Sequence, residues 1–321
     1  MRIQKSLCTV ATLCAMLAVV VLTSCEKAII PDDEAIGTAD GNLTVSVYQI
    51  EQMPFASMTR GSEVLDSETR AAATRAAVTD YCNRLNFAIY EMDGSRVKQV
   101  NQTSDKAGFG TASFSLEEGE YQLVVLAHSS NGNPTMTNPQ KIQFSNSTGY
   151  TDTFLYYTTV AVTDEHQTLS VSLERIVSMC RFVMNDAIPA GVSKLEFYYT
   201  GGSGTFSAAT GLGNVNSKQK MTFSVEQSGK AERSVTAGDI GTQYDLYTFL
   251  HQQDDDITLT VTAYDATDNV LYEREFDVPM TRRKITRLSG DFFTGDPSAS
   301  GDVGVTISIN GDWDGQTDVT Y

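Results

Sequence analysis

Apolar and polar residues alternate with a period of two along most of the chain after residue 42. Leu43, Val45 and Val47 share one phase, whereas Tyr48 and Ile50 take the other. This change of phase predicts a β-bulge near Val47. Alternation of this kind is typical of half-buried strands in antiparallel sheets. Further alternating segments lie at 85–89, 112–116, 121–127, 169–173, 180–184, 195–199, 221–225, 244–250, 257–263, 271–278, 285–288 and 303–309.

Turn-forming residues separate these segments. Asp93 and Gly94 predict one hairpin, Asp268 and Asn269 predict another, and residues 118–120 form a turn between two strands. Short strands with a turn signal about every dozen residues are typical of β-sandwiches, and no long segment has the period of a helix. The sequence therefore predicts an all-β protein.

The strands fall into two series that resemble each other. Residues 121–127 and 244–250 each begin with a tyrosine and continue as an apolar run. We therefore place a boundary near Glu174 and predict two tandem antiparallel β-sandwiches, at residues 43–174 and 175–321. The chain is long enough to form two cores of medium size.

Two segments do not fit the alternating pattern. Residues 62–81 are rich in alanine and predict either a short surface helix or an exposed loop. Arg60, Arg70 and Arg75 each follow a threonine and are candidate protease-accessible sites, although uncut loops of this kind are common. Residues 201–213 are rich in glycine but lack the lysine and the following helix of a phosphate-binding loop, so we interpret them as a loop.

The first 25 residues have the features of a bacterial lipoprotein signal. Two basic residues precede an apolar run at 7–22, and Leu22 to Cys25 resemble the lipobox, whose cysteine is acylated before cleavage. A transmembrane anchor usually needs about 20 apolar residues, and an ordinary secretory signal needs no cysteine. We predict a cleaved signal peptide at residues 1–24 and attachment to the outer membrane through lipid on Cys25.

Residues 25–42 are acidic and low in bulk, as expected for a flexible tether. Acidic residues after the acylated cysteine also resemble the signal that sends lipoproteins of the Bacteroides group to the outer face of the outer membrane. The whole chain has a formal net charge of −17. This charge argues against a nucleic-acid partner and against adsorption to an anionic membrane, so attachment depends on the lipid.

Few cysteines remain for a disulfide once the signal is removed. Of five cysteines, Cys8 and Cys14 leave with the signal and Cys25 carries lipid, which leaves Cys82 and Cys180. An oxidising compartment would permit one bridge between them. Because both lie beside strand-like segments, we favour two free thiols that pack as small hydrophobic groups.

No residue pattern indicates catalysis, a cofactor or a metal centre. His128, His166 and His251 have no carboxylate or cysteine at metal-ligand spacing, and we interpret them as surface or loop histidines. Residues 254–256 and the acids beside Trp313 could bind calcium weakly, but solvated turns explain them better. Trp313 is either a core residue or a platform for sugar stacking. The sequence therefore predicts a protein that is not an enzyme.

Five segments of the chain together resemble one known family of two-domain proteins. Residues 84–89, with the hairpin after them, and 116–125 are similar to the first domain of that family. Residues 173–181, 197–202 and 278–293 are similar to its second domain. In these segments the chain resembles the FimB-like fimbrial anchor lipoproteins of the Bacteroidales. The resemblance extends from about Leu43 to the end of the chain and includes the lipobox.

The resemblance implies two transthyretin-like, Greek-key sandwiches that anchor or join a fimbrial polymer. Fimbrial shaft subunits would be the partners, bound by strand exchange at an unpaired sheet edge. The resemblance names no host or bacterial ligand. The alternative is a surface glycan-binding lipoprotein of the same bacteria, which should display a cluster of exposed aromatic residues.

In related shaft subunits an arginine-specific protease removes the first strand. A cut after Arg60, Arg70 or Arg75 would separate residues 43–50 from the rest of the chain. A lipid-held anchor would then lose its tether unless the first strand stayed paired. We therefore predict that this strand is retained.

Overall fold

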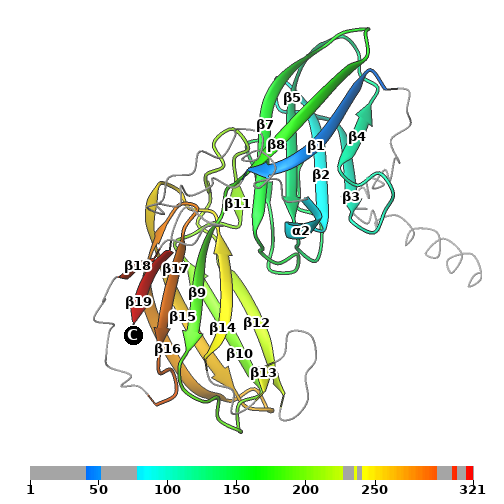
Figure 1. Cartoon of the computed structure of the whole chain (residues 1–321). Helices are drawn as coiled ribbons and strands as arrows, with labels where there is room; N and C mark the ends of the chain where they lie inside the picture. Colours follow the sequence, from blue (N-terminus) through cyan, green and yellow to red (C-terminus); the bar gives the residue numbers. More distant parts are fainter. Residues whose placement is uncertain are drawn as a thin grey trace, which may run out of the picture. The chain divides into compact units, whose positions relative to one another are not determined.

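A computed structural model describes residues 41–51, 78–226, 235–236, 241–294, 306–308 and 316–320. All of them belong to one compact unit, Glu34–Tyr321. The described elements are strands except for one helical turn, α2 (Val78–Tyr81), which confirms the all-β prediction (Figure 1). No helix in the described part of the chain is long and apolar enough to cross a membrane.

The first series of strands forms a seven-stranded sheet in the order β3-β2-β5-β7-β8-β1-β4. Strands β7 and β8 pair only at Phe154 with Arg175 and at Leu155 with Glu174, and they separate beyond these positions. The sheet therefore folds into two layers that enclose one core. The strands are β1 (Leu43–Glu51), β2 (Arg84–Glu91), β3 (Arg96–Thr103), β4 (Thr111–Phe114), β5 (Gly119–His128), β7 (Thr153–Val162) and β8 (Gln167–Arg175).

The second series forms two five-stranded sheets, β13-β12-β10-β15-β16 and β14-β9-β17-β19-β18. Phe182 is central to the core between them, with ring centroids 5.5 Å from Phe197, 5.6 Å from Phe276 and 6.1 Å from Phe292. The strands are β9 (Ser178–Met184), β10 (Lys194–Thr200), β12 (Gln219–Glu226), β13 (Val235–Thr236), β14 (Thr242–Thr248), β15 (Asp254–Tyr264), β16 (Val270–Thr281), β17 (Ile285–Gly290), β18 (Thr306–Ser308) and β19 (Gln316–Thr320).

A third apolar cluster joins the two series. It combines residues of β2 and β5 with Ile176, Phe206 and Phe249. The Phe249 ring centroid lies 4.6 Å from that of Phe206 and 5.9 Å from that of Phe144. Two short strands, β6 (Ile142–Gln143) and β11 (Thr205–Phe206), pair beside this cluster.

The expected antiparallel pairing needs correction at four places. Strand β1 runs parallel to β8, β17 runs parallel to both β9 and β19, and β12 runs parallel to β13. Alternation reports which face of a strand is apolar, but it carries no information about the direction of the neighbouring strand. The other ladders between described strands of the two large series are antiparallel, as predicted.

Local predictions agree closely with the structure at several points. The register of β1 against β8 shifts between Val47 and Gln49, which confirms the predicted bulge. The Asp93 and Gly94 turn joins β2 to β3, with Gly94 at φ 90°. Strands β3 and β7 were not predicted, because their many polar and threonine residues hide the alternation. Residues 254–256 begin β15 and do not form the expected turn.

Candidate ligand cleft and strand edges

The chain enters the first sheet through a close set of hydrogen bonds at Gly41 and Asn42. The Asn42 amide donates to the carbonyl oxygens of Leu116 at 3.0 Å and Thr163 at 2.9 Å, and its Oδ1 accepts from the Leu116 N–H at 2.9 Å. The His166 Nδ1–H donates to the Gly41 carbonyl at 2.8 Å. A Cβ on Gly41 would lie 2.5 Å from the Phe114 carbonyl oxygen, so only glycine fits there. We call Gly41, Asn42, Leu116, Thr163 and His166 the entry clamp.

Beyond the entry clamp, β1 lies inside the sheet, between β8 and β4 (Figure 1). It pairs in register with β4 from Leu43 to Ser46 and with β8 along its whole length. Leu43, Val45 and Ile50 are buried in the core. Removal of β1 would therefore expose two strand edges and the apolar space that these side chains fill.

A cleft of about 450 Å³ opens where β7 and β8 separate. The outward-facing residues of β8 form one wall, and tyrosines of β1 and β7 form another. The loop at residues 208–211 and Arg282, from the turn after β16, complete it. The lining residues are Tyr48, Leu155, Tyr156, Tyr157, Ser170, Ser172, Glu174, Ile176, Ala208, Ala209, Thr210, Gly211 and Arg282.

Arg282 is held at the cleft by the loop across from it. Its Nη2 donates to the Thr210 carbonyl at 2.8 Å. Gly211 has φ 64°, and a Cβ there would lie 2.8 Å both from Arg282 Nη2 and from Ile176 Cγ2. Glycine thus allows the loop to close on the guanidinium. Burial, and then the nearby Arg283, lower the pKa of Arg282 from its usual value.

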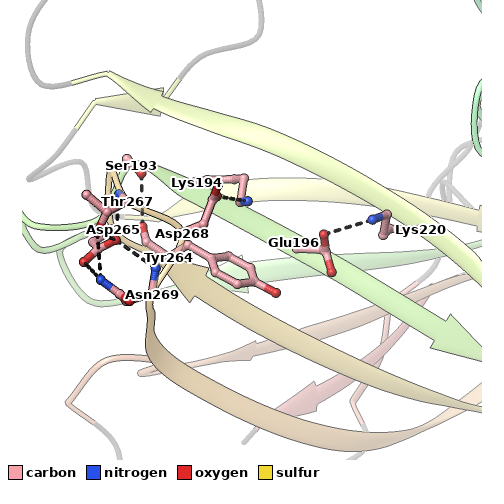
Figure 2. A network of polar contacts seen from close by, with 9 residues as sticks. All are labelled: Ser193, Lys194, Glu196, Lys220, Tyr264, Asp265, Thr267, Asp268 and Asn269. Carbon is pink, nitrogen blue, oxygen red and sulfur yellow. Dashed lines mark hydrogen bonds and ion pairs between the residues drawn. The ribbon is translucent and has the colours of Figure 1, made fainter.

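The second series ends its five-stranded sheet at β16, whose outer edge pairs with no strand in the described residues. Val270, Leu271 and Tyr272 at its start are exposed. The turn before it is ordered by Asp265, which accepts hydrogen bonds from Thr267 and Asn269 (Figure 2). Beside this turn, Lys194 lies 2.5 Å from the Asp268 carboxylate and over the ring of Tyr264.

Residues 42–321 of this chain match the model of a protein family that is described as "Family of unknown function (DUF6562)". The chain belongs to this family. A comparison with curated proteins gives no match.

Solved structures similar to this DUF6562 chain include the fimbrial anchor protein Mfa2 from Porphyromonas gingivalis, at 14% identity and a TM-score of 0.37, over 72% of this chain and 80% of that one. A fimbrial assembly protein from Parabacteroides distasonis matches at 10% identity and a TM-score of 0.35, over 79% and 91%. A candidate adhesin from Bacteroides ovatus matches at 14% identity and a TM-score of 0.42, over 68% and 88%. The structures that this chain is similar to thus include a fimbrial anchor protein and a fimbrial assembly protein, and these values assign no function to the chain.

Several residues singled out from the sequence lie outside the described part of this DUF6562 chain. They are Cys25, Arg60, Arg70, Arg75 and Trp313. Cys82 and Cys180 are free, buried thiols that belong to different core clusters. Burial raises the pKa of both, that of Cys180 to about 12. Among the described residues, no group of three or more histidine, cysteine, aspartate or glutamate side chains could hold a metal ion.

The expectation of surface or loop histidines was wrong for His128. It is fully buried at the end of β5, and its Nε2 lies 2.7 Å from Asn86 Oδ1. His166 contributes to the entry clamp. His251 lies in a loop, and its Nδ1 is 3.1 Å from the Gly213 carbonyl oxygen. The entry clamp and the cleft were both missed by sequence reasoning, because each joins residues far apart in the chain.

Proposed function

We propose that this protein is a surface-exposed lipoprotein that anchors or joins a fimbrial polymer in the outer membrane. Lipid on Cys25 holds it, residues 25–42 form the tether, and sandwiches at 43–174 and 175–321 hold a shaft subunit by strand addition. The sequence resemblance to fimbrial anchors and the lipobox support this function. The role is structural and adhesive and involves no catalysis.

The observation that carries the proposal is the position of β1. The strand next to the tether lies inside the sheet, hydrogen-bonded to β8 and β4, and the entry clamp fastens the chain where β1 begins. A force applied to the sandwich is therefore transmitted through these ladders to the tether and to the lipid. An anchor requires such a continuous path, whereas a freely diffusing protein does not.

Retention of β1 follows from the same mechanical role. Cleavage after Arg60, Arg70 or Arg75 would leave β1 as a separate peptide that only its pairing holds. The buried side chains of Leu43, Val45 and Ile50 favour a strand that stays in place. The shaft subunit then adds at another edge.

Deletion of the gene tests the function. We expect fimbriae that are shed from the cells or altered in length, and recovery of cell-bound fimbriae on complementation with the natural gene. Complementation with Cys25→Ala should leave the protein unanchored in membrane fractionation and should not restore cell-bound fimbriae. Normal fimbriae in the deletion strain, with loss of growth on one glycan, would support the glycan-binding alternative instead.

A disulfide between β1 and β8 tests whether β1 is retained. Ser46 and Ser170 are paired in register, and both are outside the core, so Ser46→Cys with Ser170→Cys should lock β1 in the sheet. We expect the locked double variant to support cell-bound fimbriae as well as either single variant does. Loss of fimbriae in the double variant, reversed by reductant, would show that β1 must leave.

A further inference from the structure

The cleft between β7 and β8 is not required by an anchoring role. It opens on the outer face of the sheet, because Ser170, Ser172 and Glu174 alternate with the buried Val171 and Leu173 along β8. Anchoring uses the backbone ladders of β1 with β8 and β4, and it does not require the side chains that line the cleft. Its chemistry therefore calls for a separate explanation.

Two polar atoms at the cleft are buried without a hydrogen-bond partner, Arg282 Nε and Ser172 Oγ. Buried donors are nearly always satisfied, and an unpaired one costs free energy. A guanidinium N–H and a hydroxyl group can both donate to an oxygen ligand, and a carboxylate makes the strongest such bond with arginine. These atoms indicate a ligand with an acidic or oxygen-rich group.

Local charge also favours an anion, although the whole chain is strongly acidic. Arg282, Arg283 and Lys284 are consecutive in the turn between β16 and β17. The one acid of the cleft, Glu174, lies 3.4 Å from Arg283 Nη1 and is thereby neutralised in part. Arg282 forms no ion pair among the described residues, so its charge is available to a ligand.

The aromatic residues of the cleft suggest a ring-shaped ligand. Tyr48 lines the cleft and is 54% exposed, so its side chain is accessible to a ligand. Tyr157 is fixed by the hydrogen bond from its hydroxyl to Gln122 Oε1 at 2.8 Å. Tyrosine offers an apolar face and a polar end, which suits a sugar ring with one apolar face and many hydroxyl groups. A volume of about 450 Å³ falls within the range of small-ligand sites.

We propose that this cleft binds an acidic saccharide, such as a uronic or sialic acid residue of a glycan. The sugar carboxylate accepts from Arg282 Nε and Ser172 Oγ, and the ring packs against Tyr48 and Tyr157. Ser170 and the backbone of the 208–211 loop lie in reach of the remaining hydroxyl groups as part of the same lining. This site does not rest on the fimbrial role, because a protein that failed to join fimbriae would still bind the sugar.

Binding of monosaccharides to the purified full chain tests the site. Glucuronic acid and N-acetylneuraminic acid are the probes, with glucose and N-acetylglucosamine as uncharged controls, and titration calorimetry with saturation-transfer NMR is the measurement. We expect saturable binding of at least one acidic sugar, about 10-fold tighter than that of either neutral sugar, as a charge-assisted bond to arginine predicts.

Variants then assign the contacts. Arg282→Gln should weaken the acidic sugar about 10-fold and leave the neutral sugars unchanged, whereas Tyr48→Ala should weaken both classes. Lys98→Gln is the matched control, because it removes one positive charge from the exposed face of β3 and should change nothing. Unfolding temperatures would verify that each variant is folded.

Three results would overturn the proposal. They are equal binding of acidic and neutral sugars, unchanged binding by Arg282→Gln, and no saturable binding of any sugar. A short peptide with a free terminal carboxylate should be tested beside the sugars. If the peptide binds at the cleft and the sugars do not, the cleft recognises a protein terminus and the proposal is wrong.

Discussion

His128 is held neutral by the hydrogen bonds around its ring. The Ser130 N–H donates to Nδ1 at 3.2 Å, so the proton lies on Nε2, which donates to Asn86 Oδ1. Asn86 in turn donates to Asn101 at 2.7 Å and to Asn133 at 3.0 Å. Burial, and then the positive charge of Arg84, lower the pKa of His128 to about 3. A second proton on Nδ1 would face the Ser130 N–H, so protonation would break this hydrogen bond and disrupt the network.

The stability of the protein should therefore depend on His128 in mild acid. The unfolded histidine binds a proton near pH 6.5 and the folded one only near pH 3, so the free energy of unfolding falls as pH drops between these values. From pH 7 to pH 4.5 this loss is about 2 to 3 kcal/mol. His128→Gln, which keeps a donor for Asn86, should show a smaller loss in urea unfolding at the two pH values. An equal loss in both proteins would contradict this account.

At the scale of elements, the hairpin between β15 and β16 depends on one carboxylate. Asp265 Oδ1 accepts from the backbone N–H groups of Thr267 at 2.8 Å and Asn269 at 2.9 Å, and Oδ2 accepts from the Asn269 side chain (Figure 2). The bonds from Asn269, and then those from Thr267, lower the pKa of Asp265 to about 2. The hairpin loop consists of residues 266–268, and its third residue, Asp268, adopts φ 64°. Three-residue hairpin loops need this left-handed conformation at their last position.

Asp265→Ala should loosen the hairpin without unfolding the sandwich. The amide protons of Thr267 and Asn269 lose their acceptor, so their hydrogen exchange should become faster, while exchange in β9 and β10 stays slow. Asp268→Asn is a suitable control, because asparagine tolerates the positive φ of this position, and the change removes the ion pair with Lys194 while it leaves the Asp265 bonds in place. Unchanged exchange in Asp265→Ala would mean that the backbone alone holds the turn.

At the scale of the whole molecule, one aromatic cluster connects the two series of strands. Phe144 comes from the first series, Phe206 and Phe249 come from the second, and all three are buried. The β6 and β11 pair adds backbone hydrogen bonds beside them. The two cores on either side are separate clusters, so cooperative unfolding of both depends on this shared one.

Phe249→Ala should separate the unfolding of the two series. The substitution removes the ring that touches both Phe144 and Phe206, at a cost of roughly 3 to 5 kcal/mol. In calorimetry we expect one transition for the natural protein and two for the variant. Phe87→Ala lies in the core of the first series alone. It should lower the free energy of unfolding, but it should separate the two calorimetric transitions less than Phe249→Ala does. A single transition in Phe249→Ala would show that the cluster does not couple the two series.

Much of the local structure was determined by the sequence itself. A period of two places Leu43 and Val45 on the buried face of β1, and the change of phase after Val47 predicts a bulge that the register confirms. The Asp93 and Gly94 hairpin follows from residues that accept its backbone angles. These features depend on neighbours in the chain, whose effects on backbone and side-chain direction are visible in the sequence.

Only the tertiary structure decided which strands pair and where the separation of β7 from β8 opens a cleft. The parallel pairing of Leu43 with Gln167, the burial of His128 and the meeting of Ser172 with Arg282 at one cleft join residues distant in sequence. Such contacts depend on the packing of whole layers, to which any single segment contributes little. Alternation requires a core but does not specify the partner strand, because many partners would bury the same face.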